Sequence, residues 1–167
     1  MPTQQPAELE RLLKEHRHKA TVFKRKAEKY IVPDEDVAKI CSFYAAYHAM
    51  RVAILSDSIF DFSDEEIYRR AKTRGVYQDS KYNTHHSAGR DSGRGVGQNQ
   101  IIASLYPKWS RDYEELHKLS IQARYVTDNS GEILPSANDG YHLACRIVDD
   151  ALNGKIYWQP KPNINQL

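Results

Sequence analysis

Residues 37–55, which read VAKICSFYAAYHAMRVAIL, constrain the fold more than any other stretch of the chain. Apolar and aromatic residues recur there at spacings of three and four along two stripes, which predicts a helix covered on most sides. At about 1.5 Å per residue, the stretch is just long enough to cross a bilayer. It also contains Tyr44, Tyr47, His48 and Arg51. These polar groups favour the central helix of a water-soluble bundle over a membrane span.

Helical spacing and cap signals elsewhere predict four main helices with short connections, and nothing reads convincingly as a strand. The central helix opens at Asp34, where acidic side chains meet the positive end of the helix dipole. Ser63 and Glu66 form a capping box for a short helix. The expected helices are Pro6 to Val32, the central stretch, about residues 64–72, Gln98 to a break near Pro107, Trp109 to near Asp128, and about residues 137–153.

The chain therefore predicts an all-α fold, an up-and-down bundle of four to five helices with one long basic loop. Its 167 residues suit a single domain, expected over residues 1–154. Gly154 fits the left-handed position that ends many helices. Residues 155–167 contain two prolines and no periodicity, which predicts an extended tail.

Charge is unevenly distributed, although the net charge is only +2. Residues 11–29 hold eight Lys/Arg against two Glu, residues 30–68 hold two basic against eight acidic groups, and residues 69–94 hold seven basic against two acidic groups. Basic patches favour polyanions such as RNA, DNA or nucleotides. For the first block, a solvated helix face is the simpler explanation.

Cys41 and Cys145 both lie in apolar helical surroundings and are expected to be buried thiols. The chain has no CxxC pair and no HExxH motif, so neither a metal site nor a cofactor is expected. The N-terminal region has no apolar core of a signal peptide, which favours the cytoplasm. His48 is expected to be a satisfied core histidine.

Residues 73–98 contain five glycines and little apolar periodicity, which predicts a long loop, and for residues 89–97 a mobile loop is the simpler interpretation. Residues 89–97 offer backbone N–H groups that can cradle a phosphate, although they match neither the Walker A pattern nor GxGxxG. The segment also carries the candidate binding residues Lys81, His85, His86, Arg90 and Arg94.

Arg124 lies near the C-terminal end of the long helix expected from Trp109. Asp128 follows one helical turn later, so the two side chains can form a local salt bridge. Alternatively the guanidinium faces a phosphate, whose oxygens match its forked geometry.

Three stretches together resemble the HEPN family of helical bundles over about residues 10–153. FYAAYHAMRVAIL at residues 43–55 is similar to the family's YYAMYHAARALL type of helix. Lys81, Asn83, Thr84 and His85 resemble the lysine-to-Thr-His stretch that often follows it. LSIQARYVTD at residues 119–128 resembles the stretch in which an arginine, three residues and then an aspartate close the third long helix.

The resemblance implies a homodimer with a cleft between paired helices, and a nucleotidyltransferase-type partner protein. Ribonuclease members of the family carry an arginine followed, after four to six residues, by a histidine that acts on the 2′-hydroxyl. Arg124 occupies the arginine position. The histidine position falls at residues 129–131, which begin with Asn129 and contain no histidine. Asparagine does not exchange a proton near neutral pH.

The leading hypothesis is therefore a binding module that holds a nucleotide or RNA near Arg124 and the basic loop, with Asp128 and Asn129 beside it. The first rival is a metal-independent ribonuclease of toxin or defence type, with the missing histidine supplied by His85, His86 or His117. The second rival is a structural, protein-binding bundle, since the chain holds 11 tyrosines and tyrosine is enriched at interfaces.

Overall fold

The computed structural model describes residues 4–86, 96–125 and 133–160, and within these ranges the chain forms helices and no strand. This confirms the expected all-α bundle. The long helices are α1 (Gln4–Tyr30), α2 (Glu35–Ser56), α5 (Pro107–Tyr125) and α6 (Ala137–Leu152). The shorter ones are the 3-10 helices η1 (Ser58–Asp61) and η2 (Gln78–Tyr82), and the α-helices α3 (Asp64–Ala71) and α4 (Gln98–Leu105).

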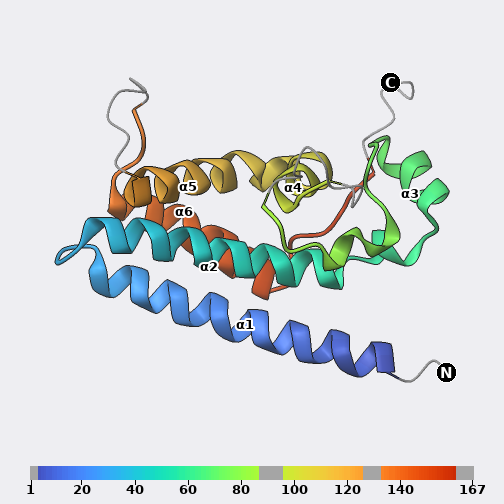
Figure 1. Ribbon diagram of the computed structural model, residues 1–167, viewed down its shortest axis with the longest axis horizontal. Coiled ribbons are helices and arrows are strands. Elements are labelled where there is room, and N and C mark those ends of the chain that lie inside the picture. Colours follow the sequence, from blue (N-terminus) through green and yellow to red (C-terminus); the bar gives the residue numbers. More distant parts are fainter. Residues whose placement is uncertain (1–3, 87–95, 126–132, 161–167) are drawn as a thin grey trace.

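Helix α2 is the centre of the bundle, as its composition predicts. It contacts α1, α5 and α6, and Figure 1 shows it lying between α1 on one side and the α5 and α6 pair on the other. The long helices run up and down, while α3, α4 and the 3-10 helices gather at one end of the bundle (Figure 1).

Small side chains allow α2 to be surrounded so closely. Ala45, Ala46 and Ala49 are all fully buried, and larger residues such as Phe43 and Met50 fill the space between the helices. An alanine-rich helix has no bulky groups to hold its neighbours apart, and alanine also favours the helical state.

The helix ends follow the sequence signals. The Asp34 carboxylate accepts a hydrogen bond from the Val37 N–H at 3.1 Å and caps α2. The Ser63 hydroxyl likewise accepts from the Glu66 N–H and caps α3. Gly154 follows α6 with a φ of 69°, in the left-handed region expected for it.

Two histidines meet in the interface between α1 and α2. His16 Nδ1 lies 2.8 Å from His48 Nδ1, and the two residues are 7% and 8% exposed. Burial lowers the pKa of His16 to about 4 and that of His48 to about 3. The pair is therefore neutral at pH 7, and one Nδ1–H donates to the other ring, as a satisfied core histidine requires.

A buried carboxylate, Asp57, directly follows the C-terminal end of α2 and links distant parts of the chain. It accepts hydrogen bonds from the Tyr106 hydroxyl at 2.9 Å and from the Trp158 backbone N–H. Residues 155–160 are without helix, in agreement with an extended segment, but Ile156 is only 4% exposed and packs into the core.

Cys41 is buried as expected, whereas Cys145 is only half-buried, and both thiols are free. No helix in the described ranges is long and apolar enough to span a membrane. In the same ranges, no three His, Cys, Asp or Glu side chains are grouped so that they could hold a metal ion.

Candidate functional site

Side chains from α2, α5 and the segment after η2 meet on one side of the bundle. They are His86, His117, Arg124 and Tyr44, called here the imidazole–arginine cluster. The two imidazole rings have centroids 5.6 Å apart, and both pack against Phe43, at 5.4 Å for His86 and 5.0 Å for His117. Arg124 lies over the Tyr44 ring, with 5.7 Å between the guanidinium carbon and the ring centroid.

Helix α5 supplies two members of the cluster from one face. His117, Ser120 and Arg124 follow one another at spacings of three and four, so their side chains lie along a single stripe. Arg124 Nε donates to the Ser120 carbonyl at 3.0 Å, and Nη2 donates to the Ser120 hydroxyl at 2.8 Å. The Nη1 atom lies 3.5 Å from the Tyr44 hydroxyl. These contacts hold the guanidinium beside α2 while leaving the residue exposed.

Helix α2 fixes the segment that carries His86. Arg51, only 1% exposed, donates from Nη1 to the Asn83 carbonyl at 2.9 Å, and the Tyr47 hydroxyl donates to the Thr84 carbonyl at 3.0 Å. These two side chains appear in the sequence as polar interruptions of an apolar helix. Their position explains the interruption, because each pairs with a backbone carbonyl that would otherwise lack a partner.

The start of α4 holds the other side of the same segment. The backbone N–H groups of Gln98 and Asn99 donate to the carbonyls of His85 and His86 at 2.8 and 3.0 Å. The first N–H groups of a helix have no partner within it, so this segment satisfies two of them. The Asn99 side chain continues the connection, since its Nδ2 lies 3.2 Å from His117 Nδ1.

Both imidazoles of the cluster are neutral at pH 7. Burial lowers the pKa of His86, and so do the neighbouring His117, were it protonated, and the Arg124 guanidinium. Burial and Arg124 also lower the pKa of His117, while the Glu114 carboxylate opposes the shift. A neutral imidazole offers one N–H donor and one nitrogen acceptor, and the buried Nδ1 of His86 has no hydrogen-bond partner among the described residues.

The structure brings together only some of the residues singled out from the sequence. Arg124 and His86 lie in the cluster, and His117 joins them as one of the histidines named for the ribonuclease alternative. His85 is exposed, with its backbone N–H bonded to Asn83 Oδ1. Lys81 faces Asp61, 4.0 Å away. The remaining candidates, Arg90, Arg94, Asp128 and Asn129, lie outside the described residues, as does the expected Arg124 to Asp128 salt bridge.

The loop expected over residues 73–98 is more regular than its composition suggests. It contains η2, and the carbonyls of residues 83–86 are bonded to α2 and α4. The hydrogen bonds that hold residues 83–86 come from helices elsewhere in the chain, so the composition of the segment does not record them. Residues 87–95 lie outside the described ranges.

Ion pairs engage three of the basic side chains of α1. Arg11 lies 2.6 Å from Glu8, Lys19 pairs with Glu15, and Lys24 reaches Asp149 at 2.8 Å. These pairs agree with a solvated face on α1.

Sequence reasoning missed Tyr44 and Asn99 as members of the site. Tyr44 lies one helical turn before His48 on α2. This spacing places the two residues on the same helix face but does not indicate that Tyr44 contacts Arg124. Asn99 carries no recognisable motif. Only the packing of α4 against α5 brings it to His117.

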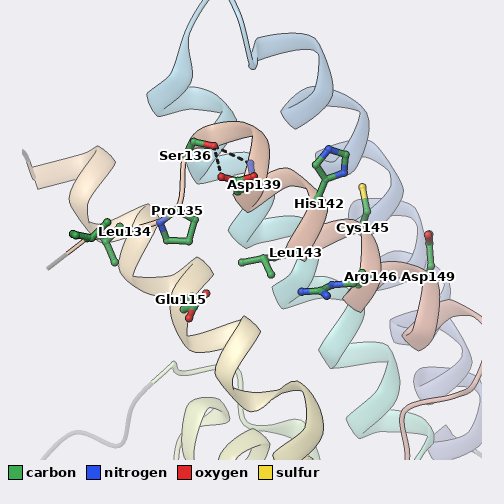
Figure 2. A pocket seen from close by; sticks show the side chains of 11 residues that line it. Glu115, Leu134, Pro135, Ser136, Asp139, His142, Leu143, Cys145, Arg146 and Asp149 are labelled. Atoms are coloured by element: carbon green, nitrogen blue, oxygen red, sulfur yellow. Dashed lines mark hydrogen bonds between the residues drawn. The ribbon is translucent and has the colours of Figure 1, made fainter.

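Two cavities lie along α5. One has a volume of 350 Å³, lies between α4 and α5, and is bordered by His117 and Asn99 of the site. The other is a groove of 890 Å³ between α5 and α6, in which Figure 2 shows Glu115 on α5 and Asp139 and Asp149 on α6. Three carboxylates against the single guanidinium of Arg146 make this groove unfavourable for a phosphate.

Comparisons of the chain with protein-family models, with curated proteins and with solved structures found no match. The resemblance to HEPN bundles therefore rests on its three motifs and stays a prediction. The homodimer and the nucleotidyltransferase partner that it implies stay predictions as well.

Proposed function

We propose that this protein binds RNA and holds one of its phosphates at the imidazole–arginine cluster. The observation that carries the proposal is the exposed guanidinium of Arg124 beside the imidazoles of His86 and His117. A guanidinium presents paired N–H donors that match phosphate oxygens. Each neutral imidazole can add one N–H donor to the same anion.

The surroundings of the guanidinium also favour this function. Among the described residues its contacts are with a carbonyl and two hydroxyls, those of Ser120 and Tyr44, and these contacts do not neutralise its charge. Aromatic side chains next to a cation are a common feature of sites for single-stranded nucleic acid, where they stack on bases.

Binding is tested by fluorescence anisotropy with a short labelled single-stranded RNA. We expect the affinity to fall about tenfold between about 50 and about 200 mM salt, as for roughly three phosphate contacts. Arg124→Ala should weaken binding by a further tenfold or more, the effect of losing one charge-assisted hydrogen bond. Arg111→Ala is the matched control, since Arg111 is an exposed arginine of the same helix that pairs locally with Glu115.

Equal affinity of the wild-type protein at both salt concentrations would remove the electrostatic basis of the proposal. Equal losses in the Arg124 and Arg111 variants would show that the cluster is not the binding site.

The two adjacent imidazoles support a second candidate function, cleavage of the bound RNA. One neutral imidazole takes the proton of a 2′-hydroxyl, whose oxygen forms a bond to phosphorus. The second imidazole, when protonated, gives a proton to the 5′-oxygen as its bond to phosphorus breaks. The products are a 2′,3′-cyclic phosphate and a 5′-hydroxyl. Since the pKa of both His86 and His117 is lowered, the protonated acid is scarce at pH 7 and the rate should rise on mild acidification.

Cleavage is tested by incubating end-labelled RNA with the protein in EDTA and identifying the ends of the products. We expect His86→Gln and His117→Gln each to abolish cleavage while RNA binding is retained. Uncut RNA at high concentrations of wild-type protein would refute the second candidate and leave the binding proposal standing.

A further inference from the structure

The cavity between α4 and α5 adjoins the imidazole–arginine cluster. Its volume is 350 Å³, within the range of about 300–1,000 Å³ that small-ligand pockets occupy. His117 belongs to both, since its ring packs against Phe43 and His86 and also lines the cavity. Asn99 also connects the cavity to the cluster, because its backbone N–H donates to the His86 carbonyl and its side-chain Nδ2 contacts His117 Nδ1.

The walls of the cavity combine an apolar floor with hydrogen-bonding groups. Ile102 and Tyr113, 1% and 2% exposed, supply buried apolar surface. Asn99 Oδ1 is buried and has no hydrogen-bond partner in the described part of the chain. Gln100, Glu114 and Lys118 line the same cavity, and Lys118 Nζ lies 3.6 Å from the Glu114 carboxylate.

These groups suit a planar heterocycle with polar edges. An apolar floor accepts the face of such a ring, and the Glu114 carboxylate is an acceptor for an N–H donor on its edge. The exocyclic amino groups of adenine, cytosine and guanine are donors of this kind, whereas uracil presents only its N3–H, between two carbonyl oxygens that a carboxylate repels.

We propose that the cavity is a nucleobase subsite and that it prefers bases carrying an exocyclic amino group. The inference rests on the proposed RNA binding. It places in the cavity the base of the nucleotide whose phosphate lies at Arg124. Along α5 the residues lining the cavity run from Ser110 to Lys118, and Arg124 follows His117 by about two turns. A nucleotide would thus extend along α5, with its base before His117 and its phosphate beyond it.

The test uses labelled five-residue ribose phosphates that carry adenine, cytosine, uracil or no base at the third position and no base elsewhere. We expect the wild-type protein to bind the adenine and cytosine probes about tenfold more tightly than the base-free probe, with uracil between them. Ala103→Trp fills the cavity from an exposed position on its rim and should reduce the adenine affinity to that of the base-free probe. Ser104→Trp, the control, places the same ring at the next exposed position, outside the cavity.

A second variant, Glu114→Gln, changes an exposed side chain without adding bulk. We expect it to narrow the difference between the adenine and uracil probes. Circular dichroism of each variant establishes that the helical fold is retained.

Failure of the subsite and failure of the phosphate site give different results. If Arg124→Ala weakens all four probes while Ala103→Trp weakens none, the nucleobase subsite is refuted and the phosphate site stands. Equal wild-type affinity for all four probes also refutes the subsite. If Arg124→Ala leaves every affinity unchanged, the phosphate site itself is refuted and the subsite loses its premise.

Discussion

The buried His16 and His48 pair makes the stability of the bundle dependent on pH. Their pKa values, about 4 and about 3, lie below the ordinary value of 6.5 that both recover on unfolding. At any pH between the folded-state pKa values and 6.5, the unfolded chain binds more protons than the folded one. The stability present above pH 6.5 is therefore lost progressively as the pH falls toward the folded-state values.

The loss in the free energy of unfolding depends only on the unfolded-state pKa, provided that the pH stays above the folded-state pKa values. At pH 5 each histidine is about 1.5 pH units below its ordinary pKa, which corresponds to about 2 kcal/mol. The two together should remove about 4 kcal/mol, a large share of the roughly 5–15 kcal/mol that stabilises a typical domain. Protonation also replaces the shared Nδ1 hydrogen bond by two facing N–H groups.

Charged groups near the pair act in both directions. Arg51 and Lys19 lower the pKa of His16 and oppose its protonation, whereas Glu15 raises it. For His48 the largest effect after burial comes from His16 itself.

The assay is urea unfolding, followed by helical circular dichroism at pH 7.5 and at pH 5. Between these pH values, the unfolding free energy of the wild-type protein should fall by about 4 kcal/mol more than that of the double variant His16→Leu/His48→Leu. The double variant replaces both partners by apolar groups of similar size, which is often close to neutral. His18→Leu, an exposed change on the same helix, should retain the wild-type pH dependence.

Parallel pH dependence in the wild-type protein and the double variant would refute this reasoning. The remaining histidines with lowered pKa values, His86 and His117, are present in both proteins and cancel in the comparison.

Two further substitutions test the packing of the bundle by urea unfolding. Asp57→Asn should cost about 2 kcal/mol, because the buried carboxylate accepts at Oδ2 from the Tyr106 hydroxyl and the Trp158 N–H and at Oδ1 from the Ile59 N–H, so an amide turns its NH2 group toward one of these donors. Gly140→Val should cost about 2 kcal/mol by overpacking, since a Cβ on Gly140 would lie 2.9 Å from Leu119 Cδ1 on α5.

Matched controls separate these effects from the chemistry of the substitutions. Asp79→Asn and Asn138→Val make comparable changes at exposed positions and should each alter the stability by less than about 0.5 kcal/mol. A Gly140 or Asp57 variant as stable as its control would contradict the packing described here.

The arrangement of helices along the chain could be predicted because its signals are local. The caps at Asp34 and Ser63, the break near Pro107 and the glycine after α6 each act within a few residues. The spacing of apolar residues similarly identified α2 as the central helix, since a helix apolar on most sides has to be surrounded.

The candidate site could be predicted only in part. Arg124 was identified from its place near the end of α5, and His86 and His117 were named among several histidines without a reason to choose between them. The choice depends on Arg51, Tyr47 and the start of α4, which hold the His86 segment against α2.

The sequence by itself determined that this chain forms a helical bundle around α2, because helix formation depends on neighbours three and four positions away. Tertiary structure alone decided that His86 meets His117 beside Arg124, that His16 pairs with His48, and that a cavity opens between α4 and α5. Contacts between residues far apart in the chain depend on how whole helices pack, and no short-range pattern records the outcome of that packing.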